Sequence, residues 1–484
     1  MIKLIVPNRG EIAVRIARAC RELGIASVLG YAEGDDIRFT QRFFDDAVSL
    51  GNSYLDVNRV IDAARACGAD ALHPGYGFLS ERAELAAACE DAGIVFVGPK
   101  ATSIAAMGSK AQSRHLMQKL GVPVVPGYDG DEQSMDALLR EGESVGFPLL
   151  VKASAGGGGK GMKIVRASNE LRAAIESAQR EAMKAFGDDR LLLERYIEEP
   201  RHVEFQIFGD AHGNIVHLFE RDCSLQRRHQ KVVEETPAPR YSDELRQRMA
   251  KAAIAAAAGV DYRNAGTVEF IVTPDNDFYF LEMNTRLQVE HPITELVTDV
   301  DLVRAQLAVA SGQPLPWKQS DLQQRGHAIE VRVYAEDPDD RFLPQSGTIA
   351  YYSEPSGPGV RVDAGVTRGS EIGLRFDPML AKLICFAETR DACIDRIARA
   401  LREYTILGTK TNVSWLRRVV THPAFREGLV STRFFEEHGD SLQPQASEAA
   451  PLIAAAIASA PRAIATGAQR RVSDVWNTVG AWGR

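Results

Sequence analysis

The chain lacks paired cysteine motifs, long apolar runs and an excess of basic residues. Its 484 residues include six cysteines and no C-x-x-C pair. Neither a disulfide framework nor a structural zinc site is therefore indicated, and reduced thiols in a cytoplasmic protein are expected. No window reaches the ~18 uninterrupted apolar residues of a membrane-spanning helix. The apolar stretch at the amino terminus, Met1–Val6, is too short for the core of a secretory signal peptide. The net charge of −8 argues against nucleic acid or an anionic membrane as a partner.

Several catalytic signatures are also missing. The first strand-to-helix turn, Asn8–Glu11, has no G-x-G-x-x-G sequence, which disfavours a dinucleotide cofactor. The absence of a G-x-S-x-G elbow, an H-E-x-x-H helix and a kinase signature leaves a triad hydrolase, a zincin and a protein kinase poorly supported. The composition, 45% hydrophobic and 25% charged, is that of a folded globular protein, and the length fits roughly three domains.

Strands and helices alternate over about residues 1–97. Short apolar strands are separated by helical patterns that end at Gly24, Gly68 and Gly93, where glycine supplies a left-handed cap. This alternation predicts an α/β fold with a doubly wound, mostly parallel sheet. The expected domains are 1–110, carrying this sheet; 111–320, with a lid at about 124–195; 326–438, after the polar boundary 318–325; and 439–484, a linker or partner-docking tail rich in alanine, proline and serine.

A glycine loop between Lys152 and Met162 is the sharpest local feature. Glycines free backbone amides to wrap an anion, and the lysines at 152 and 160 add positive charge, so phosphate is the expected ligand. The residues that follow, Met162–Val165, indicate a strand instead of the helix of a Walker loop. We therefore predict a β-hairpin lid over the phosphates of a nucleotide; the alternative is a plain surface linker, which has no need of flanking lysines.

A second predicted hairpin carries two acidic residues. Its strands, Gly266–Val272 and Phe278–Asn284, flank the turn Pro274–Asp277. A hairpin symmetric about that turn places Glu269 opposite Glu282, where the two carboxylates repel unless a cation lies between them, and oxygen ligands suit magnesium held jointly with phosphates. A β-bulge would change this register, and a solvated acidic strand face is the alternative.

Three polar runs remain: Asn284–Pro292, Arg221–Lys231 and His73–Glu81. The first two have no hydrophobic period and indicate functional loops, although each alone is more often a solvated face. The third follows a parallel strand, at the edge where α/β sheets place ligands. Together with the glycine loop and the acidic hairpin, they predict an enzyme that uses a magnesium nucleotide to activate an anionic substrate.

The motifs, in this order, resemble those of biotin carboxylase, the ATP-grasp component of biotin-dependent acyl-CoA carboxylases. The resemblance spans about residues 1–440 and rests on Asn8–Ala13, His73–Glu81, Met107–Lys110, the glycine loop, Arg221–Pro239 and Glu282–Pro292. It implies a Rossmann-like N-terminal domain, a central ATP-grasp domain and an α+β biotin carboxylase C-terminal domain. It also implies a ligase that carboxylates N1′ of biotin with ATP and bicarbonate through carboxyphosphate, the first half-reaction of an acyl-CoA carboxylase.

The resemblance assigns roles to individual residues. ATP would be bound by Lys110, Lys152, Gly157, Gly158, Gly159, Met162, Glu194, His202 and His229. Magnesium or manganese would be bound by Glu269, Glu282 and Asn284, and bicarbonate by Lys231, Arg286, Gln288 and Val289. Glu290 would act as the general base, assisted by Lys231 and Arg286. Arg332 would stabilise the biotin enolate, and Tyr76 would lie near the biotin.

Partners are also implied by the resemblance. No Ala-Met-Lys-Met sequence occurs, so the biotin is expected on a separate carrier polypeptide or on a missing C-terminal portion, as in a truncated or split α-subunit. Further expectations are a homo-oligomer or α/β hetero-oligomer and a partner carboxyltransferase subunit.

Two alternatives stay open. One is another ATP-grasp ligase, such as an aminoimidazole-ribonucleotide carboxylase-like or carbamoyl-phosphate-forming enzyme, which Gln288–Glu290 and Arg332 disfavour. The other is a nucleotide-binding scaffold without turnover. A scaffold would not need the complete set of charged residues assigned above, which are Lys231, Glu269, Glu282, Arg286, Glu290 and Arg332.

Overall fold

The computed structural model describes residues 1–154, 162–228 and 230–444, and residues 1–442 form one compact unit. The amino-terminal strands form the predicted parallel sheet, in the order β3-β2-β1-β4-β5. The elements are β1 (Lys3–Val6), α1 (Gly10–Leu23), β2 (Ala26–Tyr31), η1 (Thr40–Phe43), β3 (Asp46–Ser49), α2 (Val57–Ala66), β4 (Ala71–Leu72), α3 (Ala83–Asp91) and β5 (Val95–Phe96). Gly24 caps α1 at φ 67°, as expected. The sequence did not reveal β3, a half-exposed edge strand without an apolar run.

A smaller sheet, in the order β6-β9-β7-β8, carries the predicted lid hairpin. Its strands are β6 (Gly127–Tyr128), β7 (Leu149–Ala153), β8 (Lys163–Val165) and β9 (Leu191–Arg195). The helices of this region are α4 (Ala101–Gly108), α5 (Lys110–Lys119), α6 (Met135–Val145) and α7 (Ser168–Phe186). Strands β7 and β8 pair antiparallel, with Leu149 opposite Val165, and Leu171 of α7 packs into the same core. The hairpin is confirmed; its loop, 155–161, lies outside the described residues.

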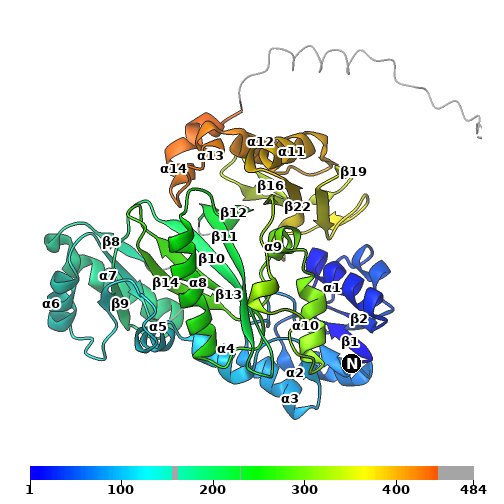
Figure 1. Cartoon of the computed structure of the whole chain (residues 1–484), viewed down its shortest axis with the longest axis horizontal. Helices are drawn as coiled ribbons and strands as arrows, with labels where there is room; N and C mark the ends of the chain where they lie inside the picture. Colours follow the sequence, from blue (N-terminus) through cyan, green and yellow to red (C-terminus); the bar gives the residue numbers. More distant parts are fainter. Residues whose placement is uncertain (155–161, 229, 445–484) are drawn as a thin grey trace, which may run out of the picture. The chain divides into compact units, whose positions relative to one another are not determined.

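The largest sheet is antiparallel, in the order β14-β13-β10-β11-β12-β15-β22-β20. Its first five strands are β10 (Arg201–Gly209), β11 (Ile215–Arg227), β12 (Gln230–Thr236), β13 (Asn264–Val272) and β14 (Phe278–Asn284). The helices in this part of the chain are α8 (Asp243–Ala258), α9 (His291–Thr298), α10 (Leu302–Ala310) and η2 (Gln319–Asp321). Helix α8 lies along this sheet (Figure 1), and its alanines pack against Phe205 and Phe270.

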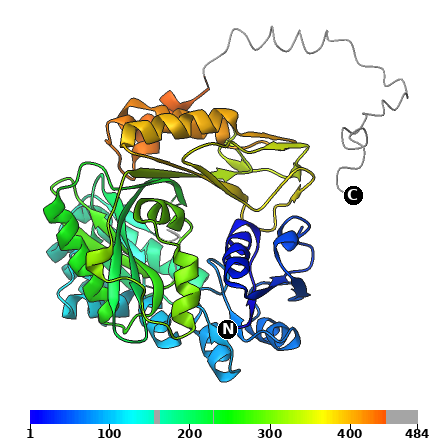
Figure 2. The ribbon, with the colours of Figure 1, turned by 45° about the vertical axis from the view of Figure 1, so that its right-hand side comes forward.

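The same sheet continues across the polar boundary that the sequence suggested. Strand β12 pairs with β15 (His327–Tyr334), with Glu234 opposite Glu330, so residues on both sides of 318–325 share one sheet. The remaining elements are β16 (Glu336–Asp337), β17 (Leu343–Pro344), β18 (Gly347–Thr348), β19 (Tyr351–Ser353), β20 (Val360–Ala364), β21 (Glu371–Ile372), β22 (Met379–Ala387), α11 (Arg390–Glu403), β23 (Thr405–Leu407), α12 (Val413–Thr421), α13 (Pro423–Arg426), α14 (Phe434–His438) and η3 (Gly439–Leu442). The orange helices α11 and α12 pack over the β15–β22 part of the sheet (Figure 2). The predicted domain limits stay predictions.

The acidic hairpin pairs Glu269 with Glu282, but not for the reason that the sequence suggested. Near the turn the register differs by one residue from the symmetric one, because Val272 lies opposite Phe278 and the Thr273 amide donates to the Asp277 carbonyl. A bulge between Glu269 and Phe270 then restores the expected pair. The assumption of a regular hairpin was therefore wrong, although the pairing it gave is right.

The six cysteines are all free, and five of them are buried. Among the helices that the structure describes, none is both long enough and apolar enough to span a bilayer.

Candidate active site

A row of charged side chains crosses four adjacent strands of the large sheet. In register, Arg221 of β11 lies opposite Glu204 of β10, Glu204 lies opposite Glu269 of β13, and Glu269 lies opposite Glu282 of β14. Residues that pair across a ladder share a face of the sheet. Three carboxylates thus lie side by side, and cations are needed to hold them there.

Lys231 of β12 provides one of these cations. Its Nζ lies 2.5 Å from a carboxylate oxygen of Glu204 and 2.7 Å from oxygens of both Glu269 and Glu290. Burial lowers the pKa of Lys231, but the three carboxylates outweigh burial and raise that pKa well above its usual range. The ammonium therefore stays charged at neutral pH.

Glu290 lies immediately before helix α9 and is fully buried. Its second oxygen accepts a hydrogen bond from Arg332 of β15 at 3.1 Å, while the Arg332 Nε donates to Glu234 at 2.6 Å. Burial raises the pKa of Glu290, but Lys231, Arg332 and Arg221 hold it well below its usual range. Glu290 is consequently a carboxylate that contacts two cations.

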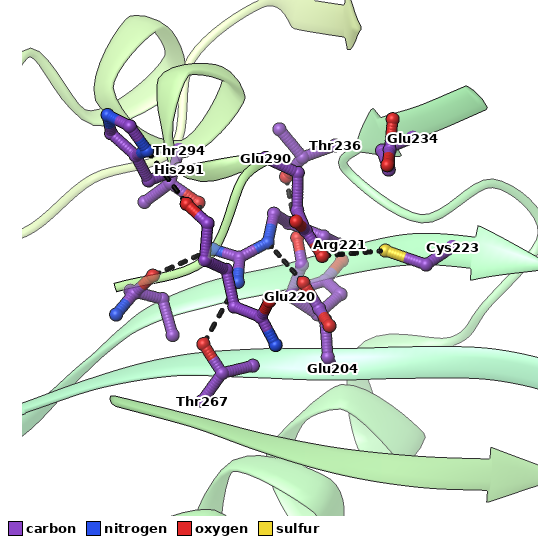
Figure 3. A network of polar contacts seen from close by, with 12 residues as sticks. Glu204, Glu220, Arg221, Cys223, Glu234, Thr236, Thr267, Glu290, His291 and Thr294 are labelled. Atoms are coloured by element: carbon purple, nitrogen blue, oxygen red, sulfur yellow. Dashed lines mark hydrogen bonds and ion pairs between the residues drawn. The ribbon is translucent and has the colours of Figure 1, made fainter. Parts of the chain in front are cut away.

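Arg221 lies beside Glu204 and Glu290 (Figure 3) and supports this arrangement. Its guanidinium is fully buried and donates to Glu204 (2.6 Å), Gln206 (2.9 Å), Thr294 (2.9 Å) and Thr267 (3.1 Å). Nearby, the Cys223 sulfur points toward Glu290 at 3.8 Å (Figure 3). Burial raises the pKa of this thiol well above its usual value, so Cys223 is an inert neighbour of Glu290.

The start of the Arg221–Lys231 run is neither the functional loop that the sequence indicated nor the solvated face that was the alternative. Residues 221–224 belong to β11 and are buried. These four residues lack a hydrophobic period because Arg221, Asp222 and Ser224 form hydrogen bonds with other groups inside the protein instead of with water.

The predicted metal ligands gather at the end of the acidic hairpin. Glu269 is buried and faces Glu282, which is exposed, and the Asn284 Nδ2 donates to Glu269 Oε1 at 2.8 Å. Two carboxylates and an amide oxygen form the donor set that magnesium prefers, so the residues present fit this ion. Their role as metal ligands stays a prediction.

Three of the predicted bicarbonate residues follow on the loop between β14 and α9. Arg286 donates to Gln288 Oε1 at 2.9 Å and lies 2.9 Å from Glu81 Oε2 of the His73–Glu81 run. Gln288 in turn donates to Glu269 at 3.1 Å, and the carbonyl of Val289 accepts from a buried lysine, Lys382, at 2.7 Å. The structure thus brings this loop against both the acidic row and the amino-terminal sheet.

The residues predicted to bind ATP lie in two places, the acidic row of the large sheet and the lid strands. His202 joins the acidic row, with Nε2 2.7 Å from Glu269 Oε2. Lys152 and Glu194 lie on the adjacent lid strands β7 and β9 and form an ion pair of 2.5 Å, and Arg114 also contacts Glu194 at 3.2 Å.

The remaining predicted residues lie outside the described ranges or near the ends of elements. Gly157, Gly158, Gly159 and His229 lie outside the described residues. Lys110 begins helix α5, and Met162 is half-buried just before β8. The Tyr76 hydroxyl is buried without a hydrogen-bond partner among the described residues, and its proximity to biotin stays a prediction.

The sequence did not single out Glu204, Glu234 and Lys382 as site residues. Glu204 was detectable: in His202–Gln206, polar side chains alternate with apolar ones, as on a strand with one polar face. The polar face becomes a site only because three other strands align charged residues with it, and strand pairing cannot be read from local pattern.

Comparison with known proteins gives a consistent result. Three family models match: "Biotin carboxylase, N-terminal domain" over residues 1–104, "Carbamoyl-phosphate synthase L chain, ATP binding domain" over 109–318, and "Biotin carboxylase C-terminal domain" over 330–437.

Among curated proteins, the chain is 48% identical over 444 residues to the biotin carboxylase of Halalkalibacterium halodurans, covering 90% of this chain and 97% of that protein. It is also 50% identical over 451 residues to the alpha subunit of the mitochondrial methylcrotonoyl-CoA carboxylase of Dictyostelium discoideum, covering 92% of this chain and 64% of that protein. The chain thus spans slightly less than two thirds of the length of the methylcrotonoyl-CoA carboxylase subunits it matches.

A solved structure is similarly close. The biotin carboxylase domain dimer of Hydrogenobacter thermophilus 2-oxoglutarate carboxylase, crystallised with MgADP, ADP and bicarbonate, has a TM-score of 0.86 and 43% identity. The match covers 92% of this chain and 99% of that one.

Proposed function

The chain belongs to the biotin carboxylase family, and on that premise we propose that it uses ATP and bicarbonate to carboxylate N1′ of biotin. One observation carries the proposal: the Glu290 carboxylate contacts both the Lys231 ammonium and the Arg332 guanidinium inside one buried cluster. The general base, a bicarbonate ligand and the group assigned to biotin are therefore adjacent.

Glu290 and the residues around it activate bicarbonate. Because its pKa is held low, Glu290 is ionised and can accept the bicarbonate proton at neutral pH. Lys231, Arg286, Gln288 and Val289 bind the anion and offset its charge. The bicarbonate oxygen then attacks the γ-phosphorus of ATP, the bond between that phosphorus and the ADP oxygen breaks, and carboxyphosphate forms.

The nucleotide is bound from the lid and the acidic hairpin. Lys110 and Lys152 hold its phosphates under the glycine loop, which includes Gly157, Gly158 and Gly159, and Met162, Glu194, His202 and His229 line the pocket. Glu269, Glu282 and Asn284 would hold magnesium, which when bound neutralises phosphate charge.

Carboxyl transfer completes the reaction. Carboxyphosphate breaks down to carbon dioxide and phosphate, the phosphate removes the N1′ proton of biotin, and N1′ attacks the carbon dioxide. Arg332 stabilises the enolate oxygen that develops on the ureido ring, and Tyr76 lies beside the biotin. The Arg332 guanidinium is preorganised for this role, because it forms ion pairs with Glu234 and Glu290.

The relatives suggest the partners. Since similar chains are alpha subunits of methylcrotonoyl-CoA carboxylase, we also propose that the biotin is presented on a carrier domain or protein and that a carboxyltransferase subunit uses the product. The dimer of the similar solved domain supports a homo-oligomer, and the alpha-subunit relatives support an α/β hetero-oligomer. The free cysteines support a reducing compartment, which we take to be the cytoplasm.

The test is ADP release by the purified chain with magnesium ATP, bicarbonate and free biotin, each omitted in turn. Biotin-stimulated, bicarbonate-dependent release that falls by about 10³-fold in Glu290→Gln supports the proposal. Turnover that ignores biotin indicates another ATP-grasp substrate. ATP binding without turnover, even with a biotinylated carrier protein, indicates a scaffold.

A further inference from the structure

Lys382 of β22 holds the backbone of the loop that carries Glu290. Its Nζ donates to the Val289 carbonyl at 2.7 Å, and this carbonyl belongs to the peptide that joins Val289 to Glu290. Lys382 is fully buried, and its Nζ lies 3.3 Å from Glu11 and 3.9 Å from Asp363. The backbone carbonyl is thus a closer partner for the ammonium than either carboxylate.

The charge of Lys382 is maintained by its surroundings. Burial lowers its pKa, but the carboxyl groups of Glu11, Glu330 and Asp363 outweigh burial and raise it. Asp363 does not depend on Lys382 for a partner, because Arg361 donates two hydrogen bonds to it, at 3.0 and 2.8 Å. A buried ammonium is costly unless its protons are well used, and the best-placed acceptor here is the carbonyl of Val289.

The direction of the Glu290 side chain makes this contact consequential. Glu290 occupies the N-cap position of α9, where a side chain commonly turns back to accept from the first amides of its helix. Glu290 makes no such bond and reaches instead to Lys231 and Arg332. The peptide plane just before Glu290 helps to set that direction, and the carbonyl of this peptide accepts the hydrogen bond from Lys382.

We propose that Lys382 is a positioning residue that keeps the Glu290 carboxylate and the Val289 backbone aligned for bicarbonate. The inference rests on the proposed function, because the roles of Glu290 and Val289 come from it. Lys382 touches no reacting atom in this scheme and acts only through the Val289–Glu290 peptide.

Two variants of Lys382 and a matched control test the proposal. Lys382→Met removes the donor and the charge at nearly constant length, whereas Lys382→Gln keeps an N–H donor without the charge. The control is Arg390→Met, which also removes a cation that donates to backbone carbonyls. Arg390 is half-buried and donates to the carbonyls of Phe425 and Arg426 at 2.6 and 2.7 Å. Steady-state ADP release is measured against bicarbonate and ATP, and amide hydrogen exchange is followed over residues 285–296.

In Lys382→Met, we expect kcat/KM for bicarbonate to fall by roughly 100-fold, because a displacement of about 1 Å is sufficient for that loss. The KM for ATP should change less than about twofold, since its ligands lie on other elements. Exchange over 285–296 should become faster in Lys382→Met and not in Arg390→Met, with Lys382→Gln intermediate in both measurements.

Three results would overturn the proposal: unchanged bicarbonate kinetics in folded Lys382→Met, equal losses of kcat/KM for ATP and for bicarbonate in that variant, or unchanged amide hydrogen exchange over residues 285–296. If Lys382→Met does not fold, Lys382→Gln carries the same comparison. If the unmodified chain releases no ADP, the proposed function fails, and the exchange comparison alone still decides whether Lys382 anchors the loop.

Discussion

Two neighbouring residues of β12, Glu234 and Glu235, point to opposite faces of the large sheet and belong to two different buried charge clusters. On one face, the Lys231 cluster consists of Lys231, Glu204, Glu269 and Glu290, with Glu234 attached through Arg332. On the other, the Glu235 cluster consists of Glu235, His327 and Arg390.

The clusters differ in charge balance. Glu235 accepts from Arg390 at 2.7 and 3.0 Å and from His327 at 2.8 Å. Burial opposes ionisation of Glu235, but these partners lower its pKa to about 2. In the Lys231 cluster, burial and the neighbouring carboxylates Glu290 and Glu269 outweigh the cations Arg221 and Lys231 and raise the pKa of Glu204 to about 7.

This difference separates a stabilising cluster from a functional one. A carboxylate matched by a cation favours the folded state. In the Lys231 cluster, four carboxylates (Glu204, Glu234, Glu269 and Glu290) share the lysine and arginine cations Lys231, Arg221 and Arg332, which leaves negative charge that folding alone does not require. Such surplus charge is retained where a substrate or a metal ion changes the balance. The clusters should therefore respond differently to substitution and to pH.

The largest effect is expected in Lys231→Met. Removing the ammonium leaves Glu204, Glu269 and Glu290 without their common partner, so ADP release should fall by about 10³-fold and the free energy of unfolding by about 3 kcal/mol. ADP release and urea unfolding measure the two losses. Lys163→Met, which breaks an exposed ion pair with Glu181, is the control and should cost less than ~1 kcal/mol. Near-normal ADP release by Lys231→Met would contradict the functional assignment.

Glu235→Gln should separate stability from catalysis. It removes the buried carboxylate that pairs with Arg390 and His327, so we expect the free energy of unfolding to fall by about 3 kcal/mol. The KM values and kcat of the folded variant should remain near those of the unmodified chain, because Glu235 faces away from Glu290. Urea titration and ADP release test this pair of outcomes. A selective rise in the KM for bicarbonate would mean that the two faces are coupled.

The pH dependence of stability should carry the signature of Glu235. Above its unfolded-state pKa, near 4.5, both states are ionised and the stabilisation of about 3 kcal/mol is fully present. As pH falls, the unfolded chain binds the proton first, so the contribution declines between about pH 4.5 and 2. Urea unfolding from pH 6 to 3 should show this loss in the unmodified chain and a smaller one in Glu235→Gln. Equal slopes for both would contradict the pKa assignment.

Local patterns in the sequence predicted much of the fold. Alternating short strands and glycine-capped helices identified the amino-terminal sheet, and flanking strands identified the lid hairpin around residues 155–161. Strand β3 escaped notice because an edge strand buries too little to show an apolar run. The extension of one sheet from β12 into β15 also escaped, because long-range pairing leaves no local signal.

The candidate site was predictable in part, for a similar reason. Motifs led to Lys231, Glu269, Glu290 and Arg332, and the structure brings these together. The Glu269–Glu282 pair followed from an assumed regular hairpin, in which the errors in turn and bulge cancelled. Lys382 was out of reach, since it lies 93 residues from Val289 in an otherwise apolar strand.

The smallest effect, and the sharpest test of the comparison, is expected in Glu204→Gln. Because the pKa of Glu204 is about 7 in the folded chain, the folded state binds its proton before the unfolded state does as pH falls. Glu204 therefore contributes stability that is present below about pH 4.5 and is lost as pH rises through 7. Glu204 is about half protonated at pH 7, whereas Glu235 is fully ionised there. A neutral glutamine at position 204 should therefore change the free energy of unfolding at pH 7 by less than ~1 kcal/mol, well below the change in Glu235→Gln. Urea titrations of both variants at pH 5 and pH 8 measure this difference in stability. If Glu204→Gln is as destabilising as Glu235→Gln at both pH values, the Lys231 cluster carries no surplus charge and the two clusters are alike.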